Sequence, residues 1–313
     1  MENSTFEHNG FKTGILFIVF NRPDFTKEVF EAIRSIKPER LYIASDGPRL
    51  NVEEDFSKVE KTREYLLSNI DWDCKVQTLF REENMGCGKN VKLAIDWFFE
   101  NEEYGIILED DCLPVPSFFQ YCEELLKRYA DDDRIGMISG ANHLTNYYNL
   151  KDSYLFSKSF TSWGWATWKR SWQFMDHDMT WLESNKMAII KNISYSRISH
   201  SHWKNAIYKV ENKLADAWDY QWYFSLSGQN QLCIFPKHNL ISNIGWGDDA
   251  THTIGKGKQS YKETENIEFP LKHPEFIMPD RKYDAIFERR TLSRQILLGL
   301  FPQSLKDRIK KIM

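Results

Sequence analysis

The sequence predicts an α/β protein with a mostly parallel, doubly wound central sheet flanked by helices. The main reason is that strand-like and helix-like segments alternate four times within about the first 130 residues. The strand-like segments are short and apolar, as buried parallel strands are. A polar cluster follows each of them, and in such sheets ligands bind beyond the carboxyl ends of the strands.

The elements of the first half follow from apolar spacing and turn residues. The first strand, GILFIVF, is closed by Asn21, Arg22 and Pro23, and the second is closed by Asp46, Gly47 and Pro48. Expected strands are 14–20, 40–45, 75–80 and 104–108, and expected helices are 24–36, 53–70, 90–100 and 116–129.

The second half is less regular, with no repeat and no low-complexity linker. Expected short strands are 135–140, 154–161 and 231–235, and expected helices are 199–213 and 219–228. A tract between them, 161–172, carries four tryptophans.

Composition excludes some classes of function. The net charge of -4 offers no basic excess for a nucleic-acid partner. The five cysteines form no CxxC pair, which favours a reducing cytoplasm over a disulfide framework. No signal-peptide pattern is present at the start, and no apolar run reaches the roughly 18 residues of a membrane-spanning helix. We therefore expect a cytoplasmic protein.

Glu109, Asp110 and Asp111 come directly after the apolar strand 104–108. Adjacent carboxylates repel one another and are tolerated where a cation lies among them. Mg²⁺ and Mn²⁺ prefer oxygen ligands, and Mg²⁺ uses one or two carboxylates together with substrate phosphates. The sequence thus predicts a Mn²⁺ or Mg²⁺ site, with a solvated acidic turn as the alternative.

At this point a family resemblance can be stated. Residues 106–121, IILEDDCLPVPSFFQY, resemble the DxD-type region of GT-A glycosyltransferases, closest to the N-acetylglucosaminyltransferase I family. Four other segments agree in order, namely 18–23 (IVFNRP), 44–47 (ASDG), 161–168 (TSWGWATW) and 217–222 (AWDYQW). The resemblance implies a GT-A fold and the metal-dependent, inverting transfer of a sugar from a nucleotide sugar, UDP-linked in that family, to an acceptor hydroxyl.

The resemblance also divides the chain. It implies a glycosyltransferase domain over 14–290, with a nucleotide-sugar half at 14–141 and an acceptor half at 142–290. Residues 1–13 are then an N-terminal extension. The basic, amphipathic tail 291–313 either contacts an anionic membrane surface or packs on its own domain. A glycan or lipid-linked glycan of the bacterial surface is the acceptor we expect.

Carried over by position, the three carboxylates take separate roles. Asp111 is implied to bind the metal, Asp110 the donor ribose and Glu109 a hydroxyl of the donor sugar. Asp219 is implied to be the catalytic base, and a carboxylate among aromatic rings loses solvation, which raises its pKa and suits proton abstraction. A helix N-cap role for Asp219 is the alternative, with Asp216 as a rival base.

Other positions complete the implied nucleotide site. Asp46 is expected to accept from the uracil imide, and Arg22 to pair with the diphosphate, next to Asn21, where the family tends to have Asp. The alternatives are a turn former and a surface charge. Residues 82–90, EENMGCGKN, resemble the Asn-x-Gly loop of family 2 glycosyltransferases, so Asn84 and Lys89 are expected at the pocket, although a Gly-rich turn into a helix gives the same pattern.

The remaining candidates lie in the second half. Trp163, Trp165 and Trp218 are expected either to form a platform for a sugar or to fill the core. His252 is expected to complete the metal shell or to be structural, and residues 245–258 are expected to form a mobile loop over the donor.

Two rival functions remain open. A nucleotidyltransferase would carry a Gly-rich loop after the first strand, where this chain has Asn21, Arg22 and Pro23. A non-catalytic sugar-binding protein would use the tryptophans without chemistry.

Overall fold

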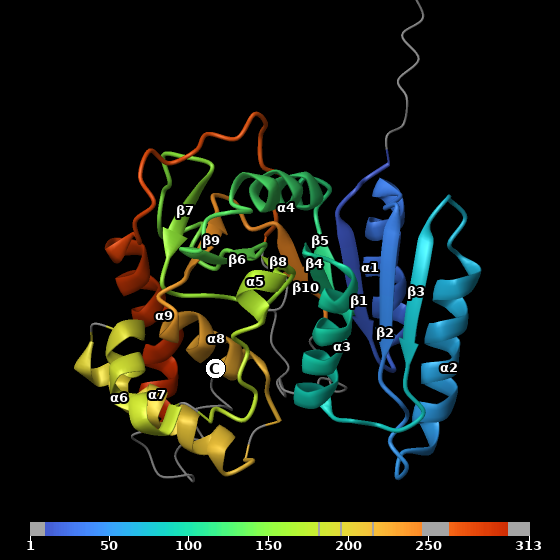
Figure 1. The fold of residues 1–313 in the computed structure, drawn as a ribbon, viewed down its shortest axis with the longest axis horizontal. Coiled ribbons are helices and arrows are strands. Elements are labelled where there is room, and N and C mark those ends of the chain that lie inside the picture. Colours follow the sequence, from blue (N-terminus) through green and yellow to red (C-terminus); the bar gives the residue numbers. More distant parts are fainter. Residues whose placement is uncertain (1–9, 181, 195, 215, 246–262, 300–313) are drawn as a thin grey trace, which may run out of the picture.

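The structure is a computed structural model that describes residues 10–180, 182–194, 196–214, 216–245 and 263–299. Its centre is an eight-stranded sheet of order β3-β2-β1-β4-β8-β6-β9-β7, with helices on both faces (Figure 1). The predicted fold class, α/β with a mostly parallel sheet flanked by helices, is confirmed.

The first half has the predicted alternation. Its elements are β1 (Gly14–Val19), α1 (Pro23–Ile36), β2 (Arg40–Ser45), α2 (Glu53–Ser68), β3 (Lys75–Phe80), α3 (Cys87–Asn101) and β4 (Tyr104–Glu109). The strands β3, β2, β1 and β4 are parallel neighbours. The strand β1 is apolar and buried on both faces, β2 and β4 are largely buried, and the edge strand β3 alternates polar and apolar residues and is only partly buried.

The second half adds shorter elements. They are β5 (Cys112–Pro114), α4 (Ser117–Arg128), β6 (Ile135–Ser139), β7 (Tyr154–Ser157), β8 (Trp165–Trp168), α5 (Lys169–Trp172), α6 (Leu182–Ile193), α7 (Arg197–Glu211), α8 (Asp219–Gly228), β9 (Leu232–Pro236), β10 (Ile241–Asn243) and α9 (Arg281–Gly299). The strands β5, β8 and β10, the helices α5 and α6, and the first part of α9 were not among the expected elements.

The direction of β8 decides which strand ends meet. It is antiparallel to both β4 and β6, so β4 and β6 run the same way, and β9 is parallel to β6. The carboxyl ends of β1, β2, β3, β4, β6 and β9 therefore share one edge of the sheet. Polar residues that follow these strands are brought to that edge from both halves of the chain.

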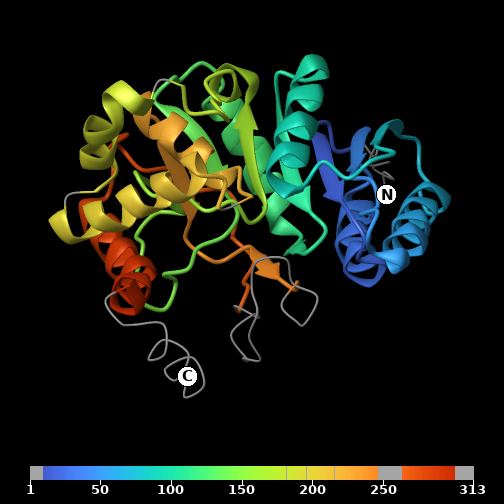
Figure 2. The same cartoon turned by 90° about the horizontal axis from the view of Figure 1, so that it is seen from below.

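Two apolar clusters cover the two faces of the sheet. One is built on α1, α2 and α4, and the other on α3, α8 and α9. Figure 2 shows α3 and α1 on opposite sides of the first strands. The helices α1, α3 and α4 are amphipathic and bury one stripe against the sheet, whereas α8 is buried on all sides from Gln221 to Ser227.

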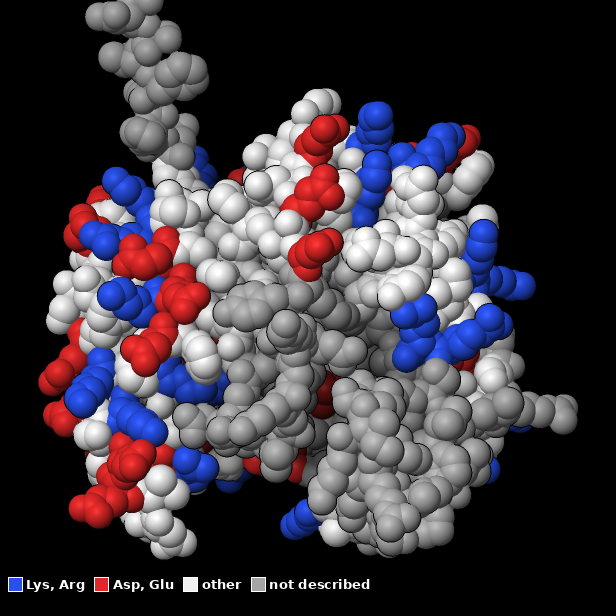
Figure 3. Space-filling view, turned by 180° about the vertical axis from the view of Figure 1, so that it is seen from behind, with Lys and Arg blue, Asp and Glu red and all other residues white. Residues whose placement is uncertain are grey.

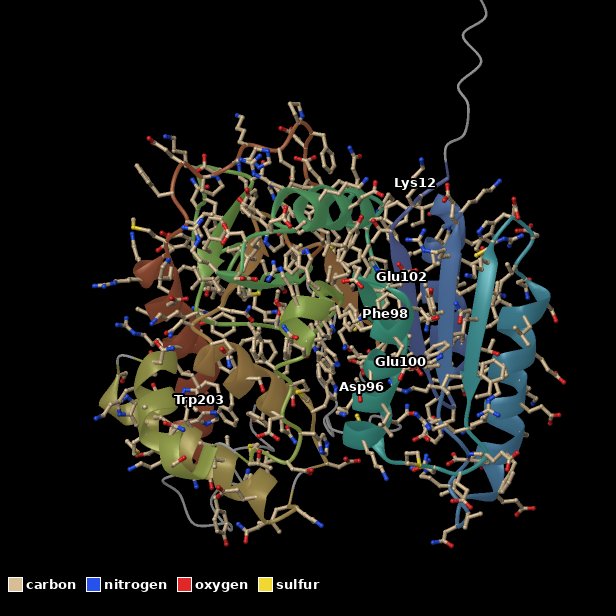
Figure 4. All side chains as sticks on the ribbon, in the orientation of Figure 1. Lys12, Asp96, Phe98, Glu100, Glu102 and Trp203 are labelled. Atoms are coloured by element: carbon tan, nitrogen blue, oxygen red, sulfur yellow. The ribbon has the colours of Figure 1, made fainter. Side chains whose placement is uncertain are left out.

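The end of α3 is tied to β2 by polar contacts. Glu102 follows α3 and accepts hydrogen bonds from Arg40 Nε at 2.5 Å and from the Tyr42 hydroxyl at 2.9 Å (Figure 4). Phe98 of α3 packs edge-on against the Tyr42 ring, with centroids 4.9 Å apart. These contacts fix α3 over β1 and β2, which positions its N-terminus at the carboxyl edge.

A third, smaller cluster joins α6, α7 and α8. Its centre is Trp203, which packs edge-on against Tyr223 and Phe224 (Figure 4).

Within the described part of the chain, no helix combines the length and apolar character needed to cross a bilayer. The predicted tail begins inside α9, which contacts α7 and β7, and residues 300–313 lie outside the described part.

On the face shown in Figure 3, Lys and Arg are interspersed with Asp and Glu on the left side, and Lys and Arg are more frequent on the right side. This face therefore presents mixed charge rather than a broad field of one sign.

Candidate functional site

The candidate site lies at the carboxyl ends of β1 and β4, which are adjacent in the sheet. Ile18 of β1 pairs with Glu109 of β4, so the residues after each strand face one another. Only three residues separate β1 from α1, and the last of them, Arg22, reaches the acidic segment. Arg22 Nη1 lies 2.9 Å from Asp111 Oδ2 and 3.6 Å from Asp110 Oδ1.

The predicted cluster of Glu109, Asp110, Asp111 and Arg22 therefore forms. Arg22 was predicted to pair with a diphosphate, and in this structure its guanidinium binds the carboxylates instead. The backbone N–H of Phe20 also donates to Asp110 Oδ2 at 3.4 Å.

Burial and mutual repulsion disfavour the ionised form of the carboxyl groups in this cluster, and Arg22 is the cation that opposes this effect. Burial, together with the charges of the neighbouring Asp111 and Asp110, raises the pKa of Glu109 to about 8. Burial likewise raises the pKa of Asp110 to about 6, against the opposing charge of Arg22. One guanidinium among three acidic groups is not enough to keep all of them ionised, which is the environment that favours an added cation.

The donor set fits a hard divalent cation with few protein ligands. Within the described residues, no group of three His, Cys, Asp or Glu side chains is arranged to hold a metal. Mg²⁺ commonly uses one or two carboxylates and takes its other oxygens from water and substrate phosphates. Asp111, with 18% of its side chain exposed, and the buried Asp110 meet that requirement.

The short sheet of β5 and β10 fixes the backbone beside Asp111. Asn243 pairs with Cys112, and the Ile244 N–H donates to the Asp111 carbonyl at 2.8 Å. Gly245 then lies directly against the acidic cluster. A Cβ at this position would be 2.7 Å from both Arg22 Nη1 and the Cβ of Asp111, so only glycine fits without displacement.

Asp219 approaches the cluster from the acceptor half. It is the first residue of α8, and its Oδ1 accepts the N–H of Tyr220 at 3.0 Å. Its charge contributes to the raised pKa values of Glu109 and of Cys87, which places it near both. Trp218 precedes the first turn of α8 and makes no side-chain cap bond, and Asp219 accepts an N–H group of that turn, so the structural role at the helix end stays beside the role as base.

The rival base, Asp216, has a different task. Its Oδ2 accepts the Cys87 N–H at 2.8 Å and its Oδ1 accepts the Gly88 N–H at 2.9 Å. A carboxylate from the second half thus caps the N-terminus of α3 in the first. No local sequence signal predicts this contact, because the two partners are 128 and 129 residues apart.

Asp46 and Asn84 hold the 82–90 loop against the end of β2. Asp46 is buried, and its Oδ1 accepts the N–H groups of Gly47 and Met85, both at 2.9 Å. Burial raises the pKa of Asp46 against these hydrogen bonds. Asn84 Nδ2 donates to the Gly47 carbonyl at 2.8 Å. Both side chains shape the loop, and the uracil contact of Asp46 stays a prediction.

Asn21 and Lys89 flank this region without joining the acidic cluster. Asn21 Nδ2 donates to the buried Asp55 at 2.6 Å, and Asp55 also binds Arg49, which lowers the pKa of Asp55. Asn21 therefore ties the turn after β1 to α2. Lys89 is exposed on the first turn of α3. Sequence reasoning missed Asp55, since it looked like one acidic residue of a polar helix.

The platform prediction is wrong for two of the three tryptophans. Trp165 is fully buried and Trp218 is 4% exposed, and their rings stack with centroids 5.6 Å apart. A ring without an exposed face fills the core and has no surface for a sugar. Trp163 is half-buried and meets His143 edge-on at 4.8 Å, so it remains a candidate.

Two further predictions fall outside the described residues. His252 and residues 246–258 of the predicted mobile loop belong to the segment 246–262, which the structure does not describe. The roles proposed for them stay predictions.

Comparisons with known proteins give only distant similarity. No family model matches the chain, and no curated protein matches it. HddC from Yersinia pseudotuberculosis is 13% identical with a TM-score of 0.31, over 50% of this chain and 77% of that one. UDP-glucose pyrophosphorylase complexed with UDP-glucose is 8% identical with a TM-score of 0.30, over 52% and 79%. The inositol-1-phosphate CTP transferase from T. maritima is 11% identical with a TM-score of 0.31, over 52% and 74%. Similarity at this level does not bear on what this chain does.

Proposed function

We propose that this protein is a metal-dependent glycosyltransferase that moves a sugar from a nucleotide sugar, with UDP as the nucleotide, to an acceptor hydroxyl. One observation carries the proposal. Asp219, at the start of α8 in the second half of the chain, lies within electrostatic range of Glu109 in the acidic cluster of Glu109, Asp110 and Asp111. A transfer reaction needs donor-binding charge and an acceptor base in one place, and this juxtaposition supplies both.

Donor binding would fall to the acidic cluster and Arg22. Asp111, with Asp110 next to it, would hold Mn²⁺ or Mg²⁺, and the bound metal would neutralise a diphosphate as it departs. The guanidinium of Arg22 can exchange carboxylate oxygens for phosphate oxygens, because its planar fork fits both. Glu109 would contact a hydroxyl of the donor sugar, since its carboxyl group is buried next to the proposed metal ligands.

Asp219 would accept the proton of the attacking hydroxyl. Its position on the first turn of a helix holds the carboxylate in place before the acceptor arrives. A single base on the acceptor side, facing the metal side, suits in-line attack with inversion at the anomeric carbon. Trp163, half-buried next to His143, is the remaining aromatic candidate for acceptor contact.

A sugar-phosphate nucleotidyltransferase is the competing function. Acidic residues at strand ends and a metal suit that chemistry as well. The turn after β1 argues against it. Only Phe20, Asn21 and Arg22 separate β1 from α1, and this turn has no glycine with which to wrap a nucleoside triphosphate.

Two assays on one protein sample separate the functions. The first supplies a panel of UDP-sugars with Mn²⁺ and measures release of UDP with and without glycan acceptors. The second supplies nucleoside triphosphates with sugar 1-phosphates and measures release of pyrophosphate. Metal-dependent UDP release that grows with acceptor supports the proposal. Pyrophosphate release supports the competitor, and glycan binding without either product supports a non-catalytic protein.

A further inference from the structure

A polar cavity of about 470 Å³ lies at the same edge of the sheet as the acidic cluster, but several strands away. Its walls come from the loop after β6, from the turn after β9, and from residues 263–265. A volume in this range is typical of small-molecule sites, which run from about 300 to 1,000 Å³. None of the residues discussed for the donor lines it.

The topology places this cavity in line with the candidate site. The sheet order from β4 is β8, β6, β9, so the ends of β6 and β9 lie two and three strands from β4. At about 4.8 Å per strand, that is about 10 to 14 Å along the edge. The His143–Trp163 contact lies between them, because Trp163 precedes β8 and His143 follows β6.

A second connection runs along β10. Asn239 forms part of the cavity wall, and six residues further on Gly245 packs against Asp111. An extended segment of that length spans at most about 20 Å. One short, buried strand therefore links the cavity to the acidic cluster.

Hydrogen bonds hold the residues at the base of the cavity wall in place. Asn239 is 2% exposed, and its Oδ1 accepts the Asn142 N–H at 3.0 Å while its Nδ2 donates to the Ile241 carbonyl at 2.8 Å. Tyr148 donates its hydroxyl to Asp280 at 2.6 Å, which fixes its ring in the wall. These bonds hold the loop after β6 and the turn after β9 in a fixed relation.

The chemistry of the lining selects a class of ligand. Amides and hydroxyls such as Asn146, Asn149 and Thr264 line the surface, together with the ionisable side chains of Lys237, His238, Glu263 and Glu265. Of the lining charges, His238 is paired with Glu265 at 2.8 Å. Amides and hydroxyls both donate and accept, which matches a polyhydroxylated ligand and offers little to a lipid chain.

We propose that this cavity binds a neutral sugar unit of an oligosaccharide acceptor, remote from the hydroxyl that reacts. This inference rests on the proposed function, because it takes the acceptor to be a glycan chain. It explains why a polar cavity lies at this edge and yet beyond the donor residues. Binding of a remote sugar unit in the cavity would compensate part of the conformational entropy that the acceptor loses when its reacting hydroxyl is positioned.

The test combines a double variant with a matched control. Asn146→Ala with Asn149→Ala removes two exposed amides from the cavity. Asn212→Ala removes an exposed amide after α7, where the side chain donates to the Tyr208 carbonyl of its own helix turn at 2.8 Å. The probes are defined neutral oligosaccharides of one to six units, built from glucose, galactose, mannose and their N-acetyl derivatives. Binding is measured by saturation-transfer NMR and calorimetry without any donor.

We expect the wild type and Asn212→Ala to bind at least one oligosaccharide, and the double variant to bind it at least ten-fold more weakly. Hydrogen exchange should slow in residues 144–150 and 237–240 when that oligosaccharide is added. Wild-type binding that the double variant keeps, or no binding to any probe, overturns the proposal. Calorimetry with UDP and Mn²⁺ on the same samples tests the donor site separately, so failure of the proposed function is distinguishable from failure of the cavity.

Discussion

Asp219 is the residue on which the inverting mechanism depends. We expect Asp219→Asn to leave UDP affinity nearly unchanged, because the proposed nucleotide contacts come from β1, β2 and β4. Turnover should fall by about two to four orders of magnitude, the usual contribution of a positioned general base. Steady-state kinetics with a UDP-sugar, together with UDP calorimetry, measures both quantities. Near-normal turnover would remove Asp219 as the base.

Gly245 supports the acidic cluster through close packing. In Gly245→Ala the added methyl group would lie 2.7 Å from Arg22 Nη1, so the Arg22–Asp111 pair must move. We expect UDP affinity in the presence of Mn²⁺ to fall at least ten-fold, with a loss of about 1 to 3 kcal/mol in the free energy of unfolding.

The control for this variant is Ser242→Ala, at the middle residue of β10 and three residues before Gly245. Its buried hydroxyl has no hydrogen-bond partner among the residues that the structure describes, so its removal should leave stability within about 0.5 kcal/mol of the wild type. Equal UDP affinity in Gly245→Ala and Ser242→Ala would show that the close packing at Gly245 does not matter for binding.

The location of a site residue could be predicted from the sequence where that residue directly follows a predicted strand. The acidic cluster and Arg22 meet because their strands are neighbours, and the first-half pattern predicted both strands. Trp165 and Asn21 were not predictable in the same way. Whether a tryptophan faces a helix or a ligand depends on which elements cover it, and here α3 and α8 cover Trp165. Asn21 serves Asp55, a contact that only the tertiary structure creates.

At the scale of elements, α3 depends on a cap from the other half of the chain. Asp216→Ala removes the acceptor for the Cys87 and Gly88 N–H groups. We expect the free energy of unfolding to fall by about 0.5 to 2 kcal/mol, as for other lost caps. Urea denaturation measures it. Asp216→Asn, which keeps an acceptor oxygen, should lose clearly less, and an equal loss in the two variants would argue against capping.

The helix α7 makes the fold sensitive to acid through His202. Burial, with a smaller effect of Lys209, lowers the pKa of His202 from 6.5 to about 4. Below pH 6.5 the imidazole of His202 therefore takes up a proton in the unfolded chain but stays neutral in the folded chain. Stability is lost as the pH falls from 6.5 towards 4.

We expect His202→Gln to lose less stability than the wild type over that pH range. The difference should be about 1 to 2 kcal/mol, less than the full shift of the pKa would give, since the ring is partly exposed. Urea denaturation at pH 7, 6, 5 and 4.5 measures it. Parallel pH profiles for the two proteins would show that His202 is not responsible.

The elements themselves divide into a predictable and an unpredictable group. Strands β1 to β4 were each placed to within one or two residues, because β1 and most of β2 and β4 are apolar runs and β3 has β-branched and aromatic residues in a period of two. The strand β8 was missed because its sequence, WATW, lies in an aromatic tract whose period resembles neither a strand nor a helix clearly. Its pairing with β4 and β6, and not its propensity, makes it a strand.

At the scale of the whole molecule, one continuous sheet joins the two predicted halves. The antiparallel strand β8 lies between β4 and β6, so the strand ends of both halves meet at one edge. The sequence predicted the first half of that edge. It did not predict the second half, because the order of β8, β6 and β9 depends on contacts between residues far apart in the chain. For that reason the cavity beyond β6 and β9 could not be predicted from the sequence.

The central claim is that the acidic edge of the sheet binds a nucleotide through a divalent metal. Calorimetric titration of UDP into the wild type and Asp111→Asn, with Mn²⁺ and with EDTA, tests it most directly. Asn keeps the size of the side chain and removes its charge, so the melting temperature should change little. The account predicts UDP binding that requires Mn²⁺ in the wild type and is at least ten-fold weaker in Asp111→Asn. Equal UDP affinity with and without Mn²⁺, or equal affinity in the two proteins, would contradict it.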